Sequence, residues 1–316
     1  MIVWILFFSM IVAFLAIDLG IFNREAHIIS YKEATKWTIV WVSLGVLFSF
    51  VIYALYAKDI MSHHTQTSAL NASIEYLTGY IIELTLSIDN IFVIALIFKS
   101  FKIPMKYQHR VLFWGIIGAL VFRGLMILFG VILIEKFTWT TYVFGAFLIY
   151  TAIKMALADE ESHFDPKESF VYRTIRRFIP VTTNMDGEKF FIKKQNLTIA
   201  TPLFLALILI EFTDVLFALD SIPAILGITT DPFIVFTSNI FAILGLRSMY
   251  FFVANMLDSF HYLKYSLTVI LIYVGVKLIL SNHFHLSIGL SLAIIFASIL
   301  IGMIFSIKYK KEHPHP

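Results

Sequence analysis

Five carboxylates lie inside apolar stretches of this sequence that are long enough to cross a lipid bilayer. They form two clusters, with Glu83 and Asp89 in the first and Glu211, Asp214 and Asp220 in the second. A charged side chain at the centre of a transmembrane helix costs about 2.5–3.5 kcal/mol, so five of them need partners, protons or a bound cation. Carboxylate oxygens are the ligands that hard divalent cations such as Mn²⁺, Mg²⁺ and Ca²⁺ prefer. The two clusters therefore predict a cation site inside the membrane.

Neutral oxygen donors accompany these acids. Asn90 follows the first cluster directly, and Thr85, Thr213 and Ser221 are candidate accessory ligands. The expected metal ligands are Glu83, Asp89, Asn90, Glu211, Asp214 and Asp220. The chain has no cysteine, which excludes disulfides and thiolate ligands. An all-oxygen site suits a hard divalent ion better than zinc or copper.

The spacing of the acids limits how they can meet. Glu83 and Asp89 are six residues apart, which separates them by about 120° and about 9 Å on a regular helix. A broken helix would bring such groups together, and Pro223 removes a backbone donor and frees the carbonyl of Leu219 beside Asp220. The sequence therefore predicts a break in the second cluster, whereas Gly79 is the only obvious weak point near the first. Glu211 and Asp214, three residues apart, are expected to share a face.

Basic residues in the apolar stretches offer a structural alternative. Asp89 and Asp220 would pair with Arg123 and Arg247 and lock the helices together, or the arginines would hold an empty site and release it to a cation. Lys154 and Lys277 are candidates for charge pairing or gating, or their long side chains reach opposite membrane surfaces. Asp18, at the end of the first apolar stretch, is either an interfacial cap or an accessory ligand.

Composition predicts that helices in a membrane position these residues. Apolar residues make up 59% of the chain, charged residues 14%, and the mean hydropathy is +0.86, values that indicate an all-α polytopic membrane protein. Nine apolar spans of sufficient length are predicted. They are Ile2–Ile21, Thr38–Ala57, Ser73–Phe98, Val111–Ile134, Thr140–Leu157, Thr201–Leu226, Phe233–Met256, Tyr265–Ser281 and Leu286–Ile307. The first span has no cleavage site and is expected to remain as a helix.

The distribution of Lys and Arg predicts the orientation. Most of the 24 basic residues lie on one side of this arrangement, and by the positive-inside rule that side is cytoplasmic. The N-terminus is then outside and the C-terminus inside, which fits a bacterial cytoplasmic membrane. The net charge of +3 reflects this topology and does not indicate a nucleic-acid partner.

The sequence also contains an internal repeat. The stretch from Glu83 to Asp89 aligns with that from Asp214 to Asp220, and the similarity continues to Arg123 with Arg247 and to Lys154 with Lys277. Each copy holds three spans, and because one loop joins them without a crossing, the second copy is inverted, as in many secondary transporters. The predicted units are two flanking helices (1–70), the first repeat (71–157), a cytoplasmic loop (158–199), the inverted repeat (200–282) and a ninth helix with a basic tail (283–316).

Several motifs resemble the TerC family of integral membrane proteins. They are Asp18-Leu-Gly-Ile-Phe-Asn-Arg24, Glu83-Leu-Thr-Leu-Ser-Ile-Asp-Asn-Ile-Phe92, Arg177-Phe-Ile-Pro-Val-Thr182 with Gly187 and Phe190-Phe191, and Glu211-Phe-Thr-Asp-Val-Leu-Phe-Ala-Leu-Asp-Ser-Ile-Pro-Ala224. The resemblance runs over nearly the whole chain. It implies Mn²⁺ efflux with the five motif acids carrying the ion. Members of the family have also been linked to tellurium resistance and to metal supply for exported enzymes.

Export of a cation needs an energy source. Moving a divalent ion outward costs about 4.6 kcal/mol per 100 mV of membrane potential. The sequence has no phosphate-binding nucleotide loop, so an ion gradient is the expected source. Carboxylates that take a metal on one side and protons on the other predict Mn²⁺/H⁺ antiport, with no tightly bound cofactor and no enzymatic activity.

Four alternatives to a transporter are considered. A membrane chaperone or accessory protein for insertion, secretion or metalation predicts that Asp89→Asn is tolerated, and a tellurite-resistance component would not carry ions itself. A structural partner of a secretion complex predicts that activity depends on residues 159–194. An intramembrane aspartyl protease is disfavoured because its Gly-x-Gly-Asp motif is missing.

Overall fold

The structure, a computed structural model, describes most of the chain. The described residues are 2–20, 29–61, 67–137, 139–157, 172–174, 177, 179–182, 185–194, 197–254, 263–280 and 288–312. The side chains of Asp18 and Asp89 lie outside the described part, as do residues 158–171 of the predicted cytoplasmic loop.

Long helices dominate the described residues and fall on the predicted apolar spans. They are α1 (Ile2–Gly20), α2 (Tyr31–Ala57), α3 (Ala69–Ser100), α4 (Met105–Lys136), α5 (Trp139–Leu157), α7 (Pro202–Leu226), α8 (Pro232–Ala254), α9 (Leu263–Leu280) and α10 (Ile288–Glu312). By length and composition, α2, α3, α4, α7 and α8 can cross a membrane, and α1, α9 and α10 contain shorter apolar stretches. The prediction of a helical membrane protein is confirmed.

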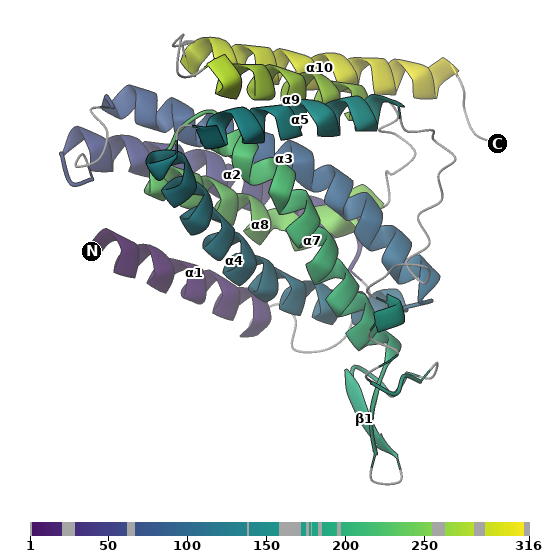
Figure 1. Cartoon of the computed structure of the whole chain (residues 1–316). Helices are drawn as coiled ribbons and strands as arrows, with labels where there is room; N and C mark the ends of the chain where they lie inside the picture. The colour runs from purple at the N-terminus through teal and green to yellow at the C-terminus, as the bar shows by residue number, and fades with distance from the viewer. Residues whose placement is uncertain are drawn as a thin grey trace.

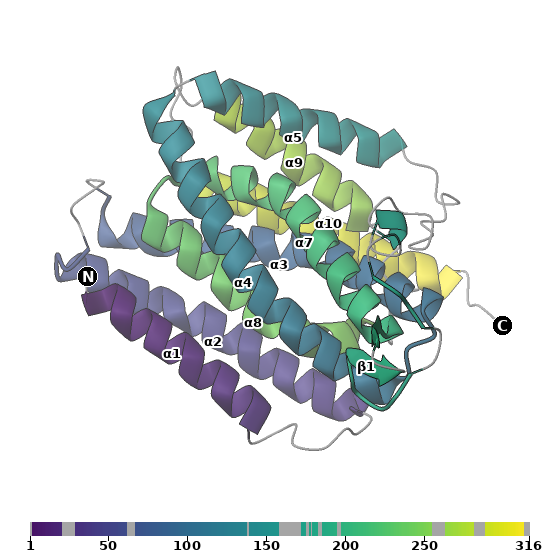
Figure 2. The same ribbon diagram turned by 60° about the horizontal axis from the view of Figure 1, so that its bottom comes forward.

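The helices form one bundle with α8 at its centre (Figures 1 and 2). In the apolar stretch of α8, 89% of the residues are buried, compared with 33% in α2 and α4. Helices α2, α3 and α4 pack around α8, α7 packs on α3 and α4, and α5, α9 and α10 form a layer on one side. The two termini lie at opposite ends of the bundle (Figure 1).

A short β-hairpin extends beyond the start of α7 (Figure 1). Strands β1 (Phe191–Lys194) and β2 (Leu197–Ala200) pair antiparallel. Just before it, the carboxylate of Glu188 accepts a hydrogen bond of 3.0 Å from Arg110 Nη1 on α4. No strand was predicted in this region, where the sequence analysis expected only a loop.

The predicted helix breaks are wrong. Helix α7 continues through Pro223 to Leu226. The proline has no N–H for the carbonyl of Leu219, but only three residues of the helix follow it, and all residues from Ser221 to Leu226 are buried. Helix α3 likewise continues through Gly79. The acidic residues therefore meet through the packing of intact helices against one another.

Candidate functional site

A buried arginine is the centre of the site. Arg123, on α4, is 1% exposed, and its guanidinium lies between a carboxylate of α3 and a carboxylate of α7. Its Nε donates to Asp214 Oδ2 at 3.0 Å and its Nη2 to Asp214 Oδ1 at 2.6 Å, while Nη1 donates to Glu83 Oε1. Bidentate pairing of this kind fixes the orientation of both groups.

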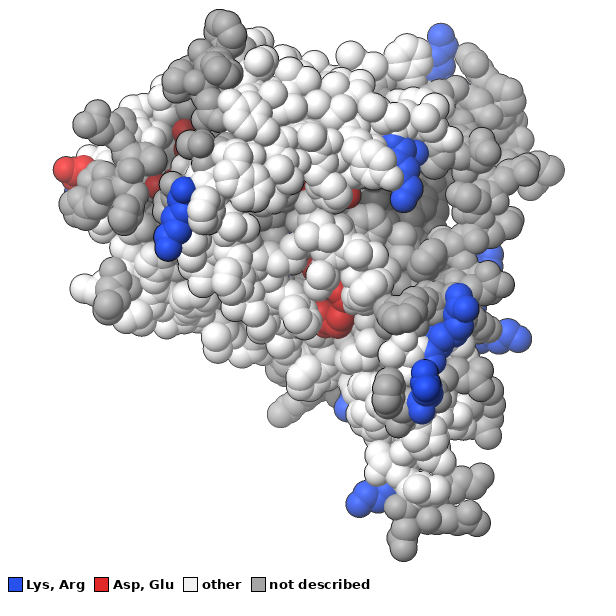
Figure 3. All heavy atoms as spheres, viewed as in Figure 1, with Lys and Arg blue, Asp and Glu red and all other residues white. Residues whose placement is uncertain are grey.

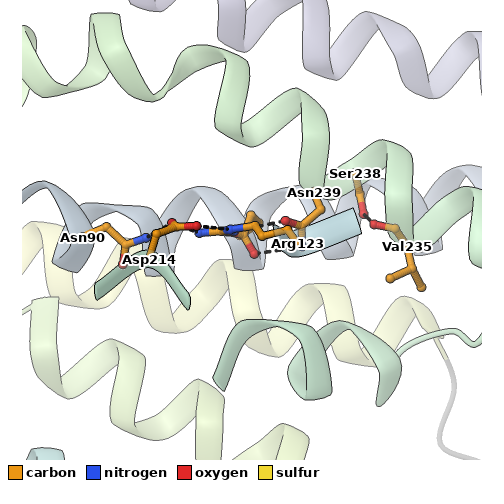
Figure 4. Close-up of polar contacts among 7 residues, drawn as sticks. Asn90, Arg123, Asp214, Val235, Ser238 and Asn239 are labelled. Carbon is orange, nitrogen blue, oxygen red and sulfur yellow. Dashed lines mark hydrogen bonds and ion pairs between the residues drawn. The ribbon is translucent and has the colours of Figure 1, made fainter. Parts of the chain in front are cut away.

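Two asparagines extend this pairing into a continuous network. Asn239, on α8, accepts from Arg123 Nη1 at 3.0 Å and donates to Glu83 Oε2 at 3.2 Å. Asn90, on α3, donates to Asp214 Oδ1 at 3.3 Å. Figure 4 shows Asn90, Asp214, Arg123 and Asn239 in a row through the bundle. Side chains from α3, α4, α7 and α8 thus meet at one buried place.

Small cavities lie on both sides of this row. One, of about 30 Å³, is lined by Glu83, Asn90, Arg123, Asp220 and Ser221 among others. The other, of about 20 Å³, has Asn90, Thr213, Asp214 and Arg247 in its lining. Each is large enough for about one water molecule or a bare ion.

Buried oxygen atoms without partners are found at the network and next to it. Asn90 Oδ1, Ser221 Oγ and Glu211 Oε2 have no hydrogen-bond partner among the described residues. Buried polar atoms are normally satisfied, so each of these needs an explanation. Asn90 and Ser221 line the 30 Å³ cavity, where a cation would find them as ligands.

Glu211 occupies space that a glycine leaves free. Its carboxylate lies against Gly118 of α4, at the position where a Cβ atom of that residue would be. Any larger residue at 118 would displace the carboxylate. The sequence motif identified Glu211, but nothing in it pointed to Gly118 as the residue that makes room.

Asp220 lies on the side of α7 that faces α5. Thr151 Oγ1 donates to Asp220 Oδ1 at 3.1 Å, and the charge of Lys154 acts on the same carboxylate. Lys154 is exposed, whereas Lys277 is 8% exposed and donates to Ser291 Oγ at 3.0 Å. The expectation that Lys277 reaches a membrane surface is therefore wrong, because its ammonium finds a partner inside the bundle.

Comparison with known proteins shows which family and which proteins this chain resembles. The model of the family described as "Integral membrane protein TerC family" matches residues 68–313. The chain belongs to the TerC family. A protein of Myxococcus xanthus printed as "Uncharacterized membrane protein STKORF319" is 44% identical over 98% of this chain and 93% of its own length.

Other relatives of this TerC protein span its length equally well. The "Putative membrane-bound redox modulator Alx" of Escherichia coli K12 is 43% identical over 97% of this chain and 94% of its own length. A membrane protein of Rickettsia felis is 43% identical over 99% of both chains. No solved structure matches.

In this TerC protein Arg123 brings Glu83 and Asp214 together, but the described acids do not form a ready metal site. Within the described residues, no three His, Asp or Glu side chains are grouped tightly enough to hold a metal ion. Arg123 lies between Glu83 of its own repeat and Asp214 of the other and pairs with both. Arg247 lines the cavity with Asp214 and not the one with Asp220.

The accessory threonines differ from the expectation. The hydroxyls of Thr85 and Thr213 donate to the carbonyls of Ile81 at 2.6 Å and Ile210 at 3.0 Å in their own helices. Thr213 lines the 20 Å³ cavity, whereas Thr85 is not among the described residues that line either cavity.

The sequence analysis of this TerC chain missed Asn239. It is fully buried and links Arg123 to Glu83. The available signal was the polar run Thr237-Ser238-Asn239 inside an otherwise apolar span. Such a run is costly in a membrane unless its groups find partners inside the protein.

Proposed function

We propose that this TerC protein is a secondary transporter that exports a divalent cation in exchange for protons. Mn²⁺ is the substrate that the family resemblance implies. The observation that carries the proposal is the position of Arg123, an internal cation held between carboxylates of α3 and α7. A transported cation would take the place of this guanidinium.

The oxygen donors around Arg123 suit such a replacement. Glu83 and Asp214 each offer two carboxylate oxygens, and Asn90 Oδ1 and Ser221 Oγ lack hydrogen-bond partners in the described structure. Hard divalent ions bind six or more oxygen ligands, carboxylate and amide oxygens among them. The adjacent 30 Å³ cavity, which Asp220 also lines, provides room for the ion beside the arginine.

We further propose that two inverted repeats form the transport path. In such a repeat α3, α4 and α5 correspond to α7, α8 and α9, respectively. The contact of α3 with α8 then corresponds to the contact of α4 with α7, and both are observed. The contacts α3–α7, α4–α8 and α5–α9 each join two corresponding helices and are also observed. Helices α3 and α7 run in opposite directions in the bundle (Figure 1). Glu83 and Asp214 come from different copies, so relative movement of the copies would open and close the site, as alternating access requires.

The proposed orientation places the N-terminus outside and the C-terminus in the cytoplasm of a bacterium. On the face shown in Figure 3, most Lys and Arg side chains lie toward the end of the bundle with the C-terminus and hairpin, while acidic atoms are visible near its middle. The positive-inside rule supports the cytoplasmic assignment of the basic end.

The Escherichia coli relative is printed as a putative membrane-bound redox modulator. This chain has no cysteine, so thiol chemistry of its own residues would not serve such a role. A proton-coupled transporter needs only groups that the chain contains, and it requires no enzymatic step.

Flux into proteoliposomes tests the proposal. Purified protein with Mn²⁺ on one side and an imposed pH gradient should show gradient-driven Mn²⁺ uptake, and Glu83→Gln or Asp214→Asn should abolish it. Asp186→Asn is the matched control, because Asp186 is exposed and pairs with Lys189, three residues away, at 2.8 Å. Absence of flux in the unmodified protein, or unchanged flux in both site variants, would favour an accessory protein for insertion, secretion or metalation.

A further inference from the structure

The β-hairpin formed by β1 and β2 lies at one end of the bundle and points away from it. Figure 1 shows α1, α5 and α10 running along the bundle, whereas the hairpin points across that direction. In the turned view of Figure 2 the hairpin lies at the same end. The network around Arg123 contains no residue of this hairpin, so its role is a separate question.

The start of α7 determines the level of the hairpin relative to a membrane. Strand β2 ends at Ala200, and α7, which is long and apolar enough to cross a membrane, begins at Pro202 with one residue between them. From Pro202 to Ile210 every residue of α7 is apolar. The hydrocarbon layer therefore begins close to the first turn of this helix. A strand that ends one residue earlier lies at the level of the lipid headgroups.

Contacts at the base of the hairpin fix its position on the bundle. The backbone N–H of Thr201 donates to the carbonyl of Phe190 at 2.9 Å. The ring of Phe191 packs against that of Phe204, in the first turn of α7, with 4.4 Å between the ring centroids. On the side of α4, Arg110 Cζ lies 5.5 Å from the centroid of the Phe190 ring. The bundle therefore holds the hairpin at the headgroup level.

The hairpin exposes apolar side chains. Ile192 pairs with Ile199, and Leu197 lies next along the same face, because side chains two residues apart on a strand share a face. Leu197 is 61% exposed, and Phe191, on the opposite face, is 43% exposed in spite of its contact with Phe204. An isolated two-stranded hairpin is at best marginally stable in water. These side chains would gain from an apolar surface outside the chain.

The charges of the hairpin are basic. Lys193 is exposed in the middle of β1, and it forms no ion pair with a described residue. The two acids that precede the hairpin are already paired, Asp186 with Lys189 and Glu188 with Arg110. Apolar side chains next to a lysine match the boundary of a lipid layer, where acyl chains lie directly beneath anionic phosphates. A lipid surface is also present at this level wherever α7 crosses a membrane.

We propose that the hairpin is a lipid anchor that binds anionic phospholipids beside the bundle. Phe191 and Leu197 reach the acyl-chain boundary, and the ammonium of Lys193 contacts the phosphate of a lipid headgroup. Because the hairpin leads directly into α7, this contact holds the start of the helix that carries Asp214 at the membrane surface. The anchor requires that α7 crosses the membrane and is independent of the ion that the protein carries.

A fluorescent reporter at Leu197 tests the anchor. The chain has no cysteine, so Leu197→Cys can be labelled at one position with an environment-sensitive dye. The whole protein is placed, one copy per disc, in lipid nanodiscs of phosphatidylcholine alone or mixed with phosphatidylglycerol. With phosphatidylglycerol, lipids spin-labelled in the upper acyl chain should quench the dye, and aqueous iodide should not. Leu128→Cys, at an exposed leucine within the span of α4, is the reference for a side chain in lipid.

Removal of one charge tests the preference for anionic lipid. In the labelled protein, Lys193→Gln should lower the ratio of protected to iodide-accessible dye about fivefold. Lys58→Gln, the same substitution at an exposed lysine just after α2, should not change that ratio.

The outcomes separate a lipid surface from other occupants. A dye at Leu197 that iodide reaches freely and that spin-labelled lipids do not quench would refute the anchor. Protection that requires two copies in a disc would assign the surface to a second copy of the chain. Equal protection in both lipid mixtures, unchanged by Lys193→Gln, would overturn the preference for anionic lipid. None of these readouts requires transport, so failure of the anchor and failure of the proposed function are distinguishable.

Discussion

Replacing Arg123 with methionine should destabilise the protein and at the same time strengthen its binding of Mn²⁺. Arg123 is 1% exposed and donates to Glu83, Asp214 and Asn239. Methionine has a similar length but no charge, so two carboxylates remain buried at one place without their counter-ion. Breaking a buried ion pair in this way costs about 3–5 kcal/mol.

A bound divalent cation should offset part of that cost. In the proposed mechanism the ion displaces the guanidinium of the unmodified protein, whereas in Arg123→Met it would meet both carboxylates directly. A ligand at a hundred times its Kd stabilises the folded state by about 2.7 kcal/mol. Because Arg123→Met has no arginine to displace, it should bind Mn²⁺ at least about tenfold more tightly than the unmodified protein. A tenfold change in affinity corresponds to about 1.4 kcal/mol. Tighter binding should also slow release, so transport should fall.

Thermal unfolding in detergent, measured with and without Mn²⁺, provides the assay. The stability deficit of Arg123→Met should shrink when Mn²⁺ is added, and its midpoint should rise more than that of the unmodified protein. Arg110→Met is the control, because Arg110 forms a partly exposed pair with Glu188 whose loss costs only about 0–1 kcal/mol. Equal responses to Mn²⁺ in Arg123→Met and the unmodified protein would refute the idea that the ion replaces the arginine. Arg123→Lys, which keeps the charge, should lie between the two.

Three further substitutions probe the surroundings. Gly118→Ala places a Cβ atom on the Glu211 carboxylate and should reduce Mn²⁺ uptake. In the control Gly115→Ala, the new Cβ atom would meet one methyl group at 3.5 Å, and uptake should not fall. Equal uptake by both variants would contradict a role for the Glu211 carboxylate. Asn239→Ala removes a hydrogen-bond partner from Arg123 and from Glu83, both buried. It should lower the free energy of unfolding, measured by denaturation in detergent, by about 1–3 kcal/mol. An unchanged free energy of unfolding would count against the network. Tyr56→Phe removes a donor to Asp231, the carboxylate that caps α8, and should cost about 1.5–3 kcal/mol while exchange of labelled for unlabelled Mn²⁺ continues; loss of exchange in a folded variant would show that this contact belongs to the metal path.

Apolar runs were sufficient to predict the helices but not their continuity. The span predicted at Thr201–Leu226 is found as α7 from Pro202 to Leu226, because its length and hydropathy leave few other structures in a membrane. Proline chemistry alone suggested a break at Pro223. The position of that residue in the last turn, together with burial on all sides of this turn, keeps the helix intact.

The sequence also indicated which charges matter without indicating how they pair. Glu83, Arg123 and Asp214 were all candidates, and the structure brings these three together. The repeat suggested that each arginine serves an acid of its own copy. Arg123 pairs with Glu83 of its own copy and also with Asp214 of the other copy, since α4 packs against α7. Such a pairing between copies depends on side-chain packing that no local pattern encodes. A neutral residue such as Asn239 gives an even weaker signal, because its importance comes entirely from its neighbours.

In the proposed exchange, charge balance at Arg123 would link the metal to the proton. With Glu83 and Asp214 ionised and Arg123 between them, the group carries one net negative charge. One proton on a carboxylate neutralises it, and so does a divalent ion that takes the place of the arginine. The carboxylates are thus neutralised in both states, but in the metal-bound state the displaced arginine keeps its positive charge.

The displaced guanidinium then needs an acceptor, and Asp220 lines the same 30 Å³ cavity as Arg123. Asp220→Asn should leave the arginine without that second position, so Mn²⁺ binding and exchange should both weaken. The double variant Arg123→Met with Asp220→Asn should bind Mn²⁺ as well as Arg123→Met alone, because no arginine remains to be accommodated. A further loss of affinity in the double variant, measured by titration of Mn²⁺ in detergent, would show instead that Asp220 is itself a ligand of the ion.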